Sequence, residues 1–68
     1  MEISARNKIK GIITEVQIGS VMAKVGVKIA DGTVINSMIT IDSVKEMNLK
    51  EGDEVFAIIK STEVMIGK

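Results

Sequence analysis

The chain has 68 residues, nine basic and nine acidic side chains, and no cysteine or histidine, which excludes disulfides, the common zinc sites and the usual nucleophile–base pairs. With a net charge of zero and no basic run, a nucleic-acid or anionic-lipid surface is not indicated, and no apolar run approaches the roughly 18 residues of a membrane span. A domain of this size buries only about 60% of its unfolded surface. Yet 46% of the residues are hydrophobic and the mean hydropathy is +0.30. We therefore expect a homo-oligomer, in which the subunit interfaces cover the apolar surface that a single copy would leave exposed.

The chain contains no proline, no Ser/Gly-rich linker and no low-complexity run, so residues 1–68 are expected to form a single domain. Its first residues are largely polar and do not resemble a signal peptide. The expected location is therefore the cytoplasm.

Three strands are expected in the first part of the chain. Ile9–Ile18 is rich in β-branched side chains, and Gly11 within it indicates a bulge or a close approach of two backbones. Residues 21–29 alternate strictly between apolar and other positions, which is the best strand signal in the chain. Asp31-Gly32 then predicts a hairpin turn before a return strand over residues 33–41.

A short helix is expected next. Ser43, followed three residues later by Glu46, has the spacing of a capping box. Val44, Met47 and Leu49 fall on one helical face. We therefore expect a short helix that is capped by Ser43.

Two more strands are expected after a turn at Glu51-Gly52-Asp53. Residues 54–60 are nearly continuous in apolar character, which predicts a strand buried on both faces, and residues 63–66 predict a last short strand. The fold class is therefore all-β: a small five-stranded barrel of the oligonucleotide/oligosaccharide-binding type, with one short helix between the third and fourth strands. Closure into a barrel would remove the exposed edges of this apolar sheet.

The parts of a catalytic site are missing. Lys60-Ser61 is a Ser–Lys pair, but it lacks an orienting group and is explained as well by a strand end with a solvated lysine. The chain has no glycine-rich phosphate loop, and its carboxylates are too scattered for a calcium loop. We therefore expect no enzymatic activity and no direct protein–metal ligands.

Nucleic-acid binding is a common function of such barrels, which stack bases on aromatic side chains and follow the backbone with positive charge. This chain has a single aromatic residue, Phe56, in a strand that is expected to be buried. The sequence therefore does not favour a nucleic-acid partner.

Small hydrogen-bond donors gather at three irregular points between the apolar strands. One segment precedes the first strand, one joins the last two strands, and one begins the short helix, whose backbone amides can also donate. Each has a simpler explanation, as an N-terminal turn, a hairpin loop or a helix cap. The candidate residues are Ser4, Ala5, Arg6, Asn7, Thr40, Ser43, Lys60, Ser61 and Thr62.

Together these groups have the chemistry of a site for a fully ionised tetrahedral dianion. Hydroxyls, amides, one guanidinium and one ammonium donate hydrogen bonds, and apart from Asp42 no carboxylate lies among them. Phosphate often keeps a proton at neutral pH and benefits from an acceptor, whereas sulfate, molybdate and tungstate carry no proton. The choice between sulfate and molybdate depends on the size of the cavity.

Three separated strings also carry a resemblance to a known family. Ser4-Ala5-Arg6-Asn7, the segment 39–44 and the ending 60–66 closely resemble, in order and spacing, the molbindins. These are the small bacterial Mop, or molybdenum-pterin-binding, proteins with a TOBE-like module. The resemblance covers the whole chain.

The resemblance implies an oligonucleotide-binding-type barrel assembled as a homohexamer, a trimer of dimers. It implies molybdate or tungstate held non-covalently between subunits, with no redox cofactor. It also implies that the oxyanion is contacted by Ser4, the Ala5 amide, Arg6, Lys60 and Ser61, with Thr40 and Ser43 from a neighbouring segment. Asn7 and Thr62 complete the motifs.

The predicted function is therefore intracellular binding of molybdate or tungstate for storage or homeostasis. An alternative is a non-catalytic oligomerisation or interaction module that binds no oxyanion. A third, weaker option is a nucleic-acid-binding barrel. The molybdenum or tungsten content of the purified protein would separate the first two.

Overall fold

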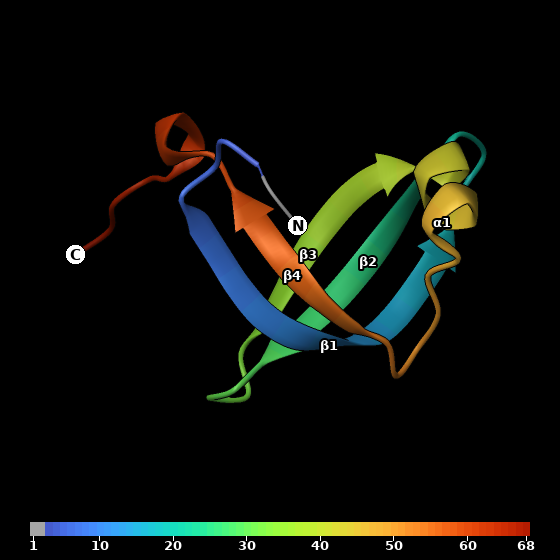
Figure 1. Ribbon diagram of the computed structural model, residues 1–68, viewed down its shortest axis with the longest axis horizontal. Coiled ribbons are helices and arrows are strands. Elements are labelled where there is room, and N and C mark those ends of the chain that lie inside the picture. Colours follow the sequence, from blue (N-terminus) through green and yellow to red (C-terminus); the bar gives the residue numbers. More distant parts are fainter. Residues whose placement is uncertain (1–2) are drawn as a thin grey trace.

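The computed structural model describes residues 3–68 and shows a strongly curled antiparallel sheet with a short helix at one end (Figure 1). The sheet order is β3-β2-β1-β4, so β3 and β4 form its two edges. No helix within residues 3–68 has the length and apolar character needed to cross a bilayer. The elements are, in chain order, β1 (Asn7–Ile18), β2 (Met22–Ile29), β3 (Val34–Thr40), α1 (Ile41–Met47), β4 (Glu54–Ile59) and a 3₁₀ turn, η1 (Ser61–Glu63).

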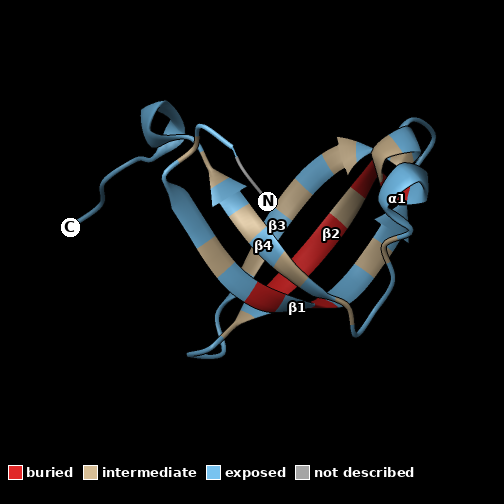
Figure 2. Cartoon of the chain, in the orientation of Figure 1, coloured by how far each residue is buried: buried red, intermediate tan, exposed pale blue. Residues whose placement is uncertain are grey.

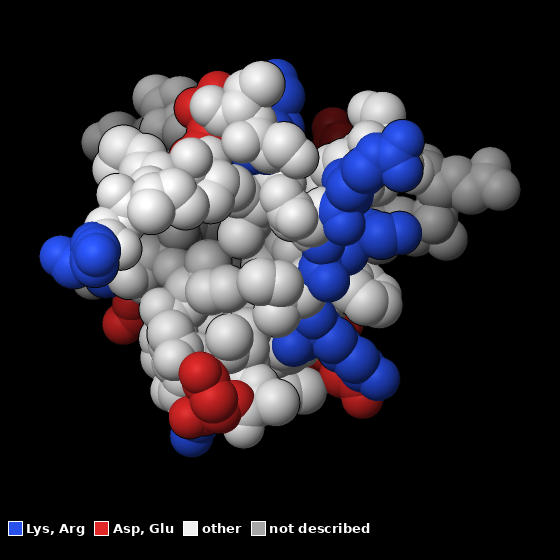
Figure 3. Space-filling model, turned by 90° about the vertical axis from the view of Figure 1, so that its left-hand side faces the viewer, with Lys and Arg blue, Asp and Glu red and all other residues white. Residues whose placement is uncertain are grey.

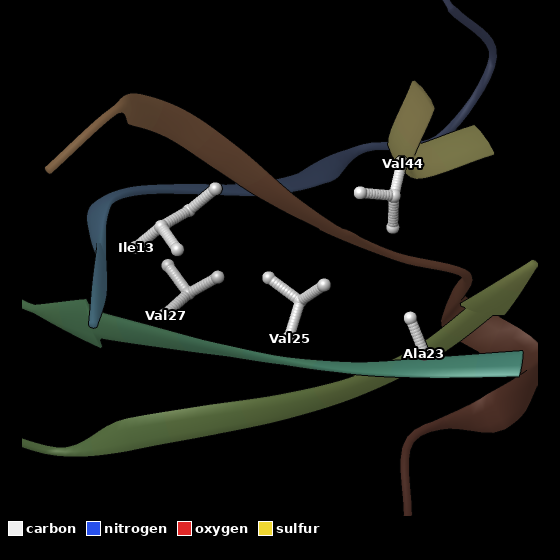
Figure 4. Packing of buried hydrophobic residues seen from close by; sticks show 5 residues of the cluster. All are labelled: Ile13, Ala23, Val25, Val27 and Val44. Atoms are coloured by element: carbon white, nitrogen blue, oxygen red, sulfur yellow. The ribbon is translucent and has the colours of Figure 1, made fainter. Parts of the chain in front are cut away.

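The core follows from the period-two pattern of β1 and β2. Ile13 pairs with Val27 and Val16 with Val25, so these side chains point to the concave face of the curled sheet. α1 lies over one end of this face and contributes Val44 (Figures 2 and 4). The core is therefore small, and its buried members are Ile13, Ala23, Val25, Val27 and Val44.

Gly11 allows β1 to lie close against β2. A Cβ at this position would be 2.6 Å from Val27 Cγ1 and 2.7 Å from the Lys28 carbonyl oxygen, which is too close for any side chain. The close approach expected at Gly11 is thus confirmed. The bulge lies further along, where the register shifts between Ile13 and Glu15 and the strand bends.

The predicted hairpin turn between β2 and β3 is present. Gly32 adopts a φ of +93°, in the left-handed region that favours glycine. The Asp31 carboxylate accepts the Thr33 backbone N–H at 2.8 Å, and this hydrogen bond lowers the pKa of the Asp31 carboxyl below its ordinary value. Gly52, with a φ of +92°, turns the chain in the same way before β4.

α1 starts earlier than the sequence pattern indicates. Its N-cap is Thr40, whose hydroxyl accepts the Ser43 backbone N–H at 3.0 Å. Ser43 is therefore the third helical residue, and the expected capping box with Glu46 is wrong. The reason is that Thr40, the last residue of β3, already has the extended backbone and the side-chain oxygen that a cap requires. Asn48, at a φ of 51°, ends the helix in the left-handed region.

β4 is an edge strand, and the expected burial on both of its faces is wrong. It pairs only with β1, and its side chains alternate between half-buried and exposed. Phe56 and Ile58 are 50% and 42% exposed on the convex face. The apolar run predicted two buried faces, but in a single-layer sheet nothing within residues 3–68 covers the convex one.

Residues 3–68 form four strands, so the fifth strand expected over residues 63–66 is not formed within the chain. η1 turns the chain away after β4, and residues 64–66 continue without a sheet partner. Met65 and Ile66 are 90% and 91% exposed. The barrel is consequently open between β3 and β4, where an apolar groove of about 300 Å³ follows the concave face.

Candidate functional site

The pairing of β1 with β4 places the N-terminal donor segment, residues 4–7, beside residues 60–62. Asn7 begins β1 and is the register partner of Ile59, the last residue of β4. The Asn7 side-chain Nδ2 donates to the Ser61 Oγ at 3.5 Å. Both segments lie at the end of the sheet opposite α1 (Figure 1). Two of the three predicted donor segments therefore meet within one chain.

The segment after β4 has a local order of its own. The Lys60 carbonyl accepts the Glu63 backbone N–H at 2.9 Å, and the Ser61 carbonyl accepts the Val64 N–H at 3.4 Å. These hydrogen bonds use the carbonyl oxygens of the 3₁₀ turn. The side chains of Lys60, Ser61 and Thr62 remain exposed and available to a ligand.

The same end of the molecule carries positive charge. Arg6 and Lys60 are exposed, and neither takes part in any of the three ion pairs found within residues 3–68. The space-filling view of this end shows a band of Lys and Arg side chains (Figure 3). An open hollow of about 470 Å³ lies over the N-terminal segment, lined by Ile3, Ser4, Ala5, Arg6 and Lys8.

Thr40 and Ser43 form a second, separate donor group. The Thr40 hydroxyl donates to the Ser43 Oγ at 2.9 Å and accepts the Ser43 N–H at 3.0 Å. Thr40 pairs with Met22 at the α1 end of the sheet, whereas Asn7 marks the opposite end. The 12 residues of β1 join the two ends, a contour of roughly 40 Å at about 3.3 Å per residue. One chain therefore does not bring the third group to the first two.

The chemistry of both groups suits an anion and not a cation. Arginine and lysine only donate hydrogen bonds, and a hydroxyl donates one. The neighbouring acidic residues, Asp42 and Glu63, are exposed. Within residues 3–68, no cluster of three or more Asp or Glu side chains is placed to hold a metal ion. Each of the two groups therefore offers hydrogen-bond donors of the kind that an oxyanion requires.

The curled sheet and its donor segments define a small, open β-barrel module with groups for an anion. The TOBE domain model matches residues 3–66. A probable molybdenum-pterin-binding protein of Haemophilus influenzae is 48% identical, covering 98% of this chain and 97% of its own length. Molybdenum-pterin-binding protein 1 of Clostridium pasteurianum is 50% identical, over 97% of both chains.

The fold comparison agrees with the sequence comparison. The solved structure of a molybdate-binding protein from Sporomusa ovata superposes with a TM-score of 0.93 at 43% identity, covering all of both chains. The chain belongs to the TOBE domain family and, within it, to the molbindins, the small molybdenum-pterin-binding proteins. The resemblance seen in the sequence is confirmed.

Two features of the site were missed by reasoning from the sequence. The first is the contact between Asn7 and Ser61, which depends on β4 pairing with the start of β1. The second is that Thr40 and Ser43 bond to each other. The spacing of the two residues, three apart before an apolar helical face, is the signal that could have identified Thr40 as the cap.

Proposed function

We propose that the chain binds molybdate or tungstate non-covalently and stores or buffers the oxyanion. The observation that carries the proposal is the contact between Asn7 and Ser61, because it holds two donor segments and their cations at one end of the sheet. The printed names of the relatives support the ligand, since one is a molybdate-binding protein and others are molybdenum-pterin-binding proteins.

The proposed ligand contacts combine charged and neutral donors. Hydrogen bonds from a charged donor are roughly twice as strong as neutral ones, so Arg6 and Lys60 each contribute more to the affinity than any single neutral donor. The hydroxyls and the backbone amide orient the oxyanion. The proposed site consists of Ser4, the Ala5 amide, Arg6, Asn7, Lys60, Ser61 and Thr62, together with Thr40 and Ser43.

A second copy of the chain completes the site in this proposal. Thr40 and Ser43 lie at the α1 end of the sheet, and the other donors lie at the Asn7 end. Contact between the α1 end of one copy and the Asn7 end of another would bring all of them around one anion. The homohexamer implied by the family resemblance, a trimer of dimers, provides such interfaces.

The missing fifth strand belongs to the same proposal. The groove between β3 and β4 is apolar and open, and residues 64–66 are apolar, exposed and without a partner strand. A chain of this length is marginal when that much apolar surface faces water. In this proposal, residues 63–66 of each copy lie in the groove of another copy. There they add the fifth strand and close the barrel.

We further propose that the 68 residues act as one binding unit in the cytoplasm, without a redox cofactor and without nucleic acid or membrane as a partner. Phe56 is exposed, but a single ring does not make the series of aromatic side chains that stacks successive bases. Catalysis is not proposed, because the Ser–Lys pair at Lys60-Ser61 lacks the orienting group that a catalytic site requires.

Calorimetric titration of the purified oligomer with molybdate tests the proposal, with tungstate as a second ligand and sulfate and phosphate as controls. Saturable binding of molybdate and tungstate, with a much weaker response to sulfate and phosphate, is the expected result. The absence of heat with molybdate and tungstate, from a correctly folded oligomer, would overturn it.

A second candidate function is a non-catalytic interaction module that binds no oxyanion. The exposed apolar side chains of the groove and the tail favour this candidate, because they require a protein partner whether or not an anion is present. Elemental analysis separates the two functions. Stoichiometric molybdenum or tungsten in the protein purified from supplemented cells supports the oxyanion function. If the protein contains neither metal, even after titration with molybdate, the result supports the interaction module.

A further inference from the structure

We propose that Lys8 is a third cation of the oxyanion site, and that it attracts the anion through space from the rim of the hollow over the N-terminal segment. This inference rests on the proposed oxyanion function, and it names a residue outside the proposed set of contacts. Its basis is the lining of the hollow and the arrangement of charges around Lys8 within residues 3–68.

Lys8 shares the hollow with residues that precede β1. The hollow is lined by Ser4, Ala5 and Arg6, which belong to the proposed contacts, and also by Lys8. Lys8 is an exposed residue of β1, and strand pairing opposite Ile58 fixes its place. At about 3.3 Å per residue of extended chain, it lies about 7 Å from Arg6 along the backbone. An anion held by Arg6 is therefore within range of the Lys8 charge.

The charge of Lys8 is not offset by a carboxylate at the neighbouring positions of the strand pair. Lys8 lies opposite Ile58, and its diagonal neighbours are Phe56 and Lys60, the residue that follows β4. It takes no part in any of the three ion pairs within residues 3–68. The field of Lys8 therefore adds to the fields of Arg6 and Lys60.

Lys10, two residues further along β1, has a different environment. It is also exposed, but its Nζ lies 3.2 Å from the Glu54 Oε1. The opposite charges of this pair largely cancel at a distance. The positive field at this end of the sheet, where Figure 3 shows a band of basic side chains, is therefore assigned to Arg6, Lys8 and Lys60.

A cation that acts through space has properties that a contact lacks. Attraction between separated, exposed charges raises the local concentration of a charged ligand and is screened by salt, whereas a buried contact is screened much less. The charge of the side chain matters, and its shape does not. The net charge of zero is no obstacle, because the attraction depends on the charges near the site.

Calorimetric titration of the oligomer with molybdate at about 0.01 M and about 1 M sodium chloride tests this role, because the Debye length falls from about 30 Å to about 3 Å. Lys8→Gln removes the charge, and Lys8→Arg keeps it. Lys10→Gln is the matched control, since it removes the same charge from the same strand about twice as far from Arg6. Circular dichroism and light scattering establish that each variant keeps the fold and the assembly.

Lys8→Gln is expected to weaken molybdate binding by about three- to sevenfold at low salt and by less than about 1.5-fold at high salt, as Coulomb attraction to a dianion about 7 Å away in water predicts. Lys8→Arg should retain the affinity, and Lys10→Gln should change it by at most about twofold at either salt concentration.

Three results would overturn the proposal: no loss for Lys8→Gln at low salt, an equal loss for Lys10→Gln, or a loss that persists at high salt, which would make Lys8 a direct contact. Failure of the unmutated protein to bind molybdate is a different result, which removes the proposed function itself.

Discussion

The side-chain amide of Asn7 lies 3.5 Å from the hydroxyl oxygen of Ser61, although 54 residues separate them in the chain. The contact exists because Asn7 and Ile59 are register partners at the end of the β1–β4 pair. Strand pairing, and not a local loop, therefore fixes the distance between the two donor segments. Donors held in this way lose little conformational entropy when an anion binds.

The first prediction concerns the two cations of the site. Arg6→Ala and Lys60→Ala are each expected to weaken molybdate binding by about 10- to 100-fold, because a hydrogen bond from a charged group contributes about 1.5–3 kcal/mol. Both side chains are exposed, so the fold should be unaffected. Calorimetry measures the affinity, and circular dichroism checks the fold.

Lys28→Ala is the matched control for this prediction, because it removes one exposed positive charge from β2 without touching the donor segments. Its molybdate affinity should remain within about twofold of the unmutated protein, since long-range charge effects are largely screened by salt. Equal losses in all three variants would show that bulk charge, and not the site, controls binding.

The second prediction distinguishes Thr40 from Ser43. Thr40→Ala is expected to lower the free energy of unfolding by about 1 kcal/mol, the usual cost of losing a helix N-cap. Ser43→Ala should change it little, because the capping donor is the Ser43 backbone N–H, which the substitution keeps. Urea denaturation of both variants measures the difference. Similar stabilities for the two would contradict the assignment of Thr40 as the cap.

The third prediction concerns Gly11. Gly11→Ala is expected to destabilise the fold by about 1–3 kcal/mol, the range for forcing extra volume into a packed site, because the added Cβ would lie 2.7 Å from the Lys28 carbonyl oxygen. Gly67→Ala is the control, since no atom lies within 4 Å of its Cβ position. Thermal unfolding compares the two. A Gly11 variant as stable as the Gly67 variant would mean that β1 and β2 can separate at little cost.

The strands with strict alternation were the most predictable part of this fold. β2 and the Asp31-Gly32 turn follow directly from period-two hydrophobicity and from the φ that the turn requires. The limits of β4 were also close, but its burial was not. An apolar run predicts that both faces of a strand are covered, and it does not show whether the cover comes from the same chain.

The members of the proposed site were chosen from the sequence, but their grouping in space could not be predicted from it. The residue types of Arg6 and Lys60 already indicate an anion, and the family resemblance named their segments. Which segments meet within one chain depends on the pairing of β4 with the start of β1, and that pairing is not encoded in the spacing of the motifs. The cap was misassigned because Ser43-Glu46 and Thr40-Ser43 have the same three-residue spacing.

The last prediction concerns the C-terminal tail. Deletion of residues 64–68 is expected to reduce the oligomer to smaller species and to abolish tight molybdate binding, because it removes three exposed apolar side chains that we assign to the groove of another copy. Multi-angle light scattering measures the mass, and calorimetry measures the binding. Deletion of residues 67–68 alone removes no apolar side chain and should preserve both. An unchanged mass for the longer deletion would show that the fifth strand is not supplied by the tail, and the groove would then need a different partner.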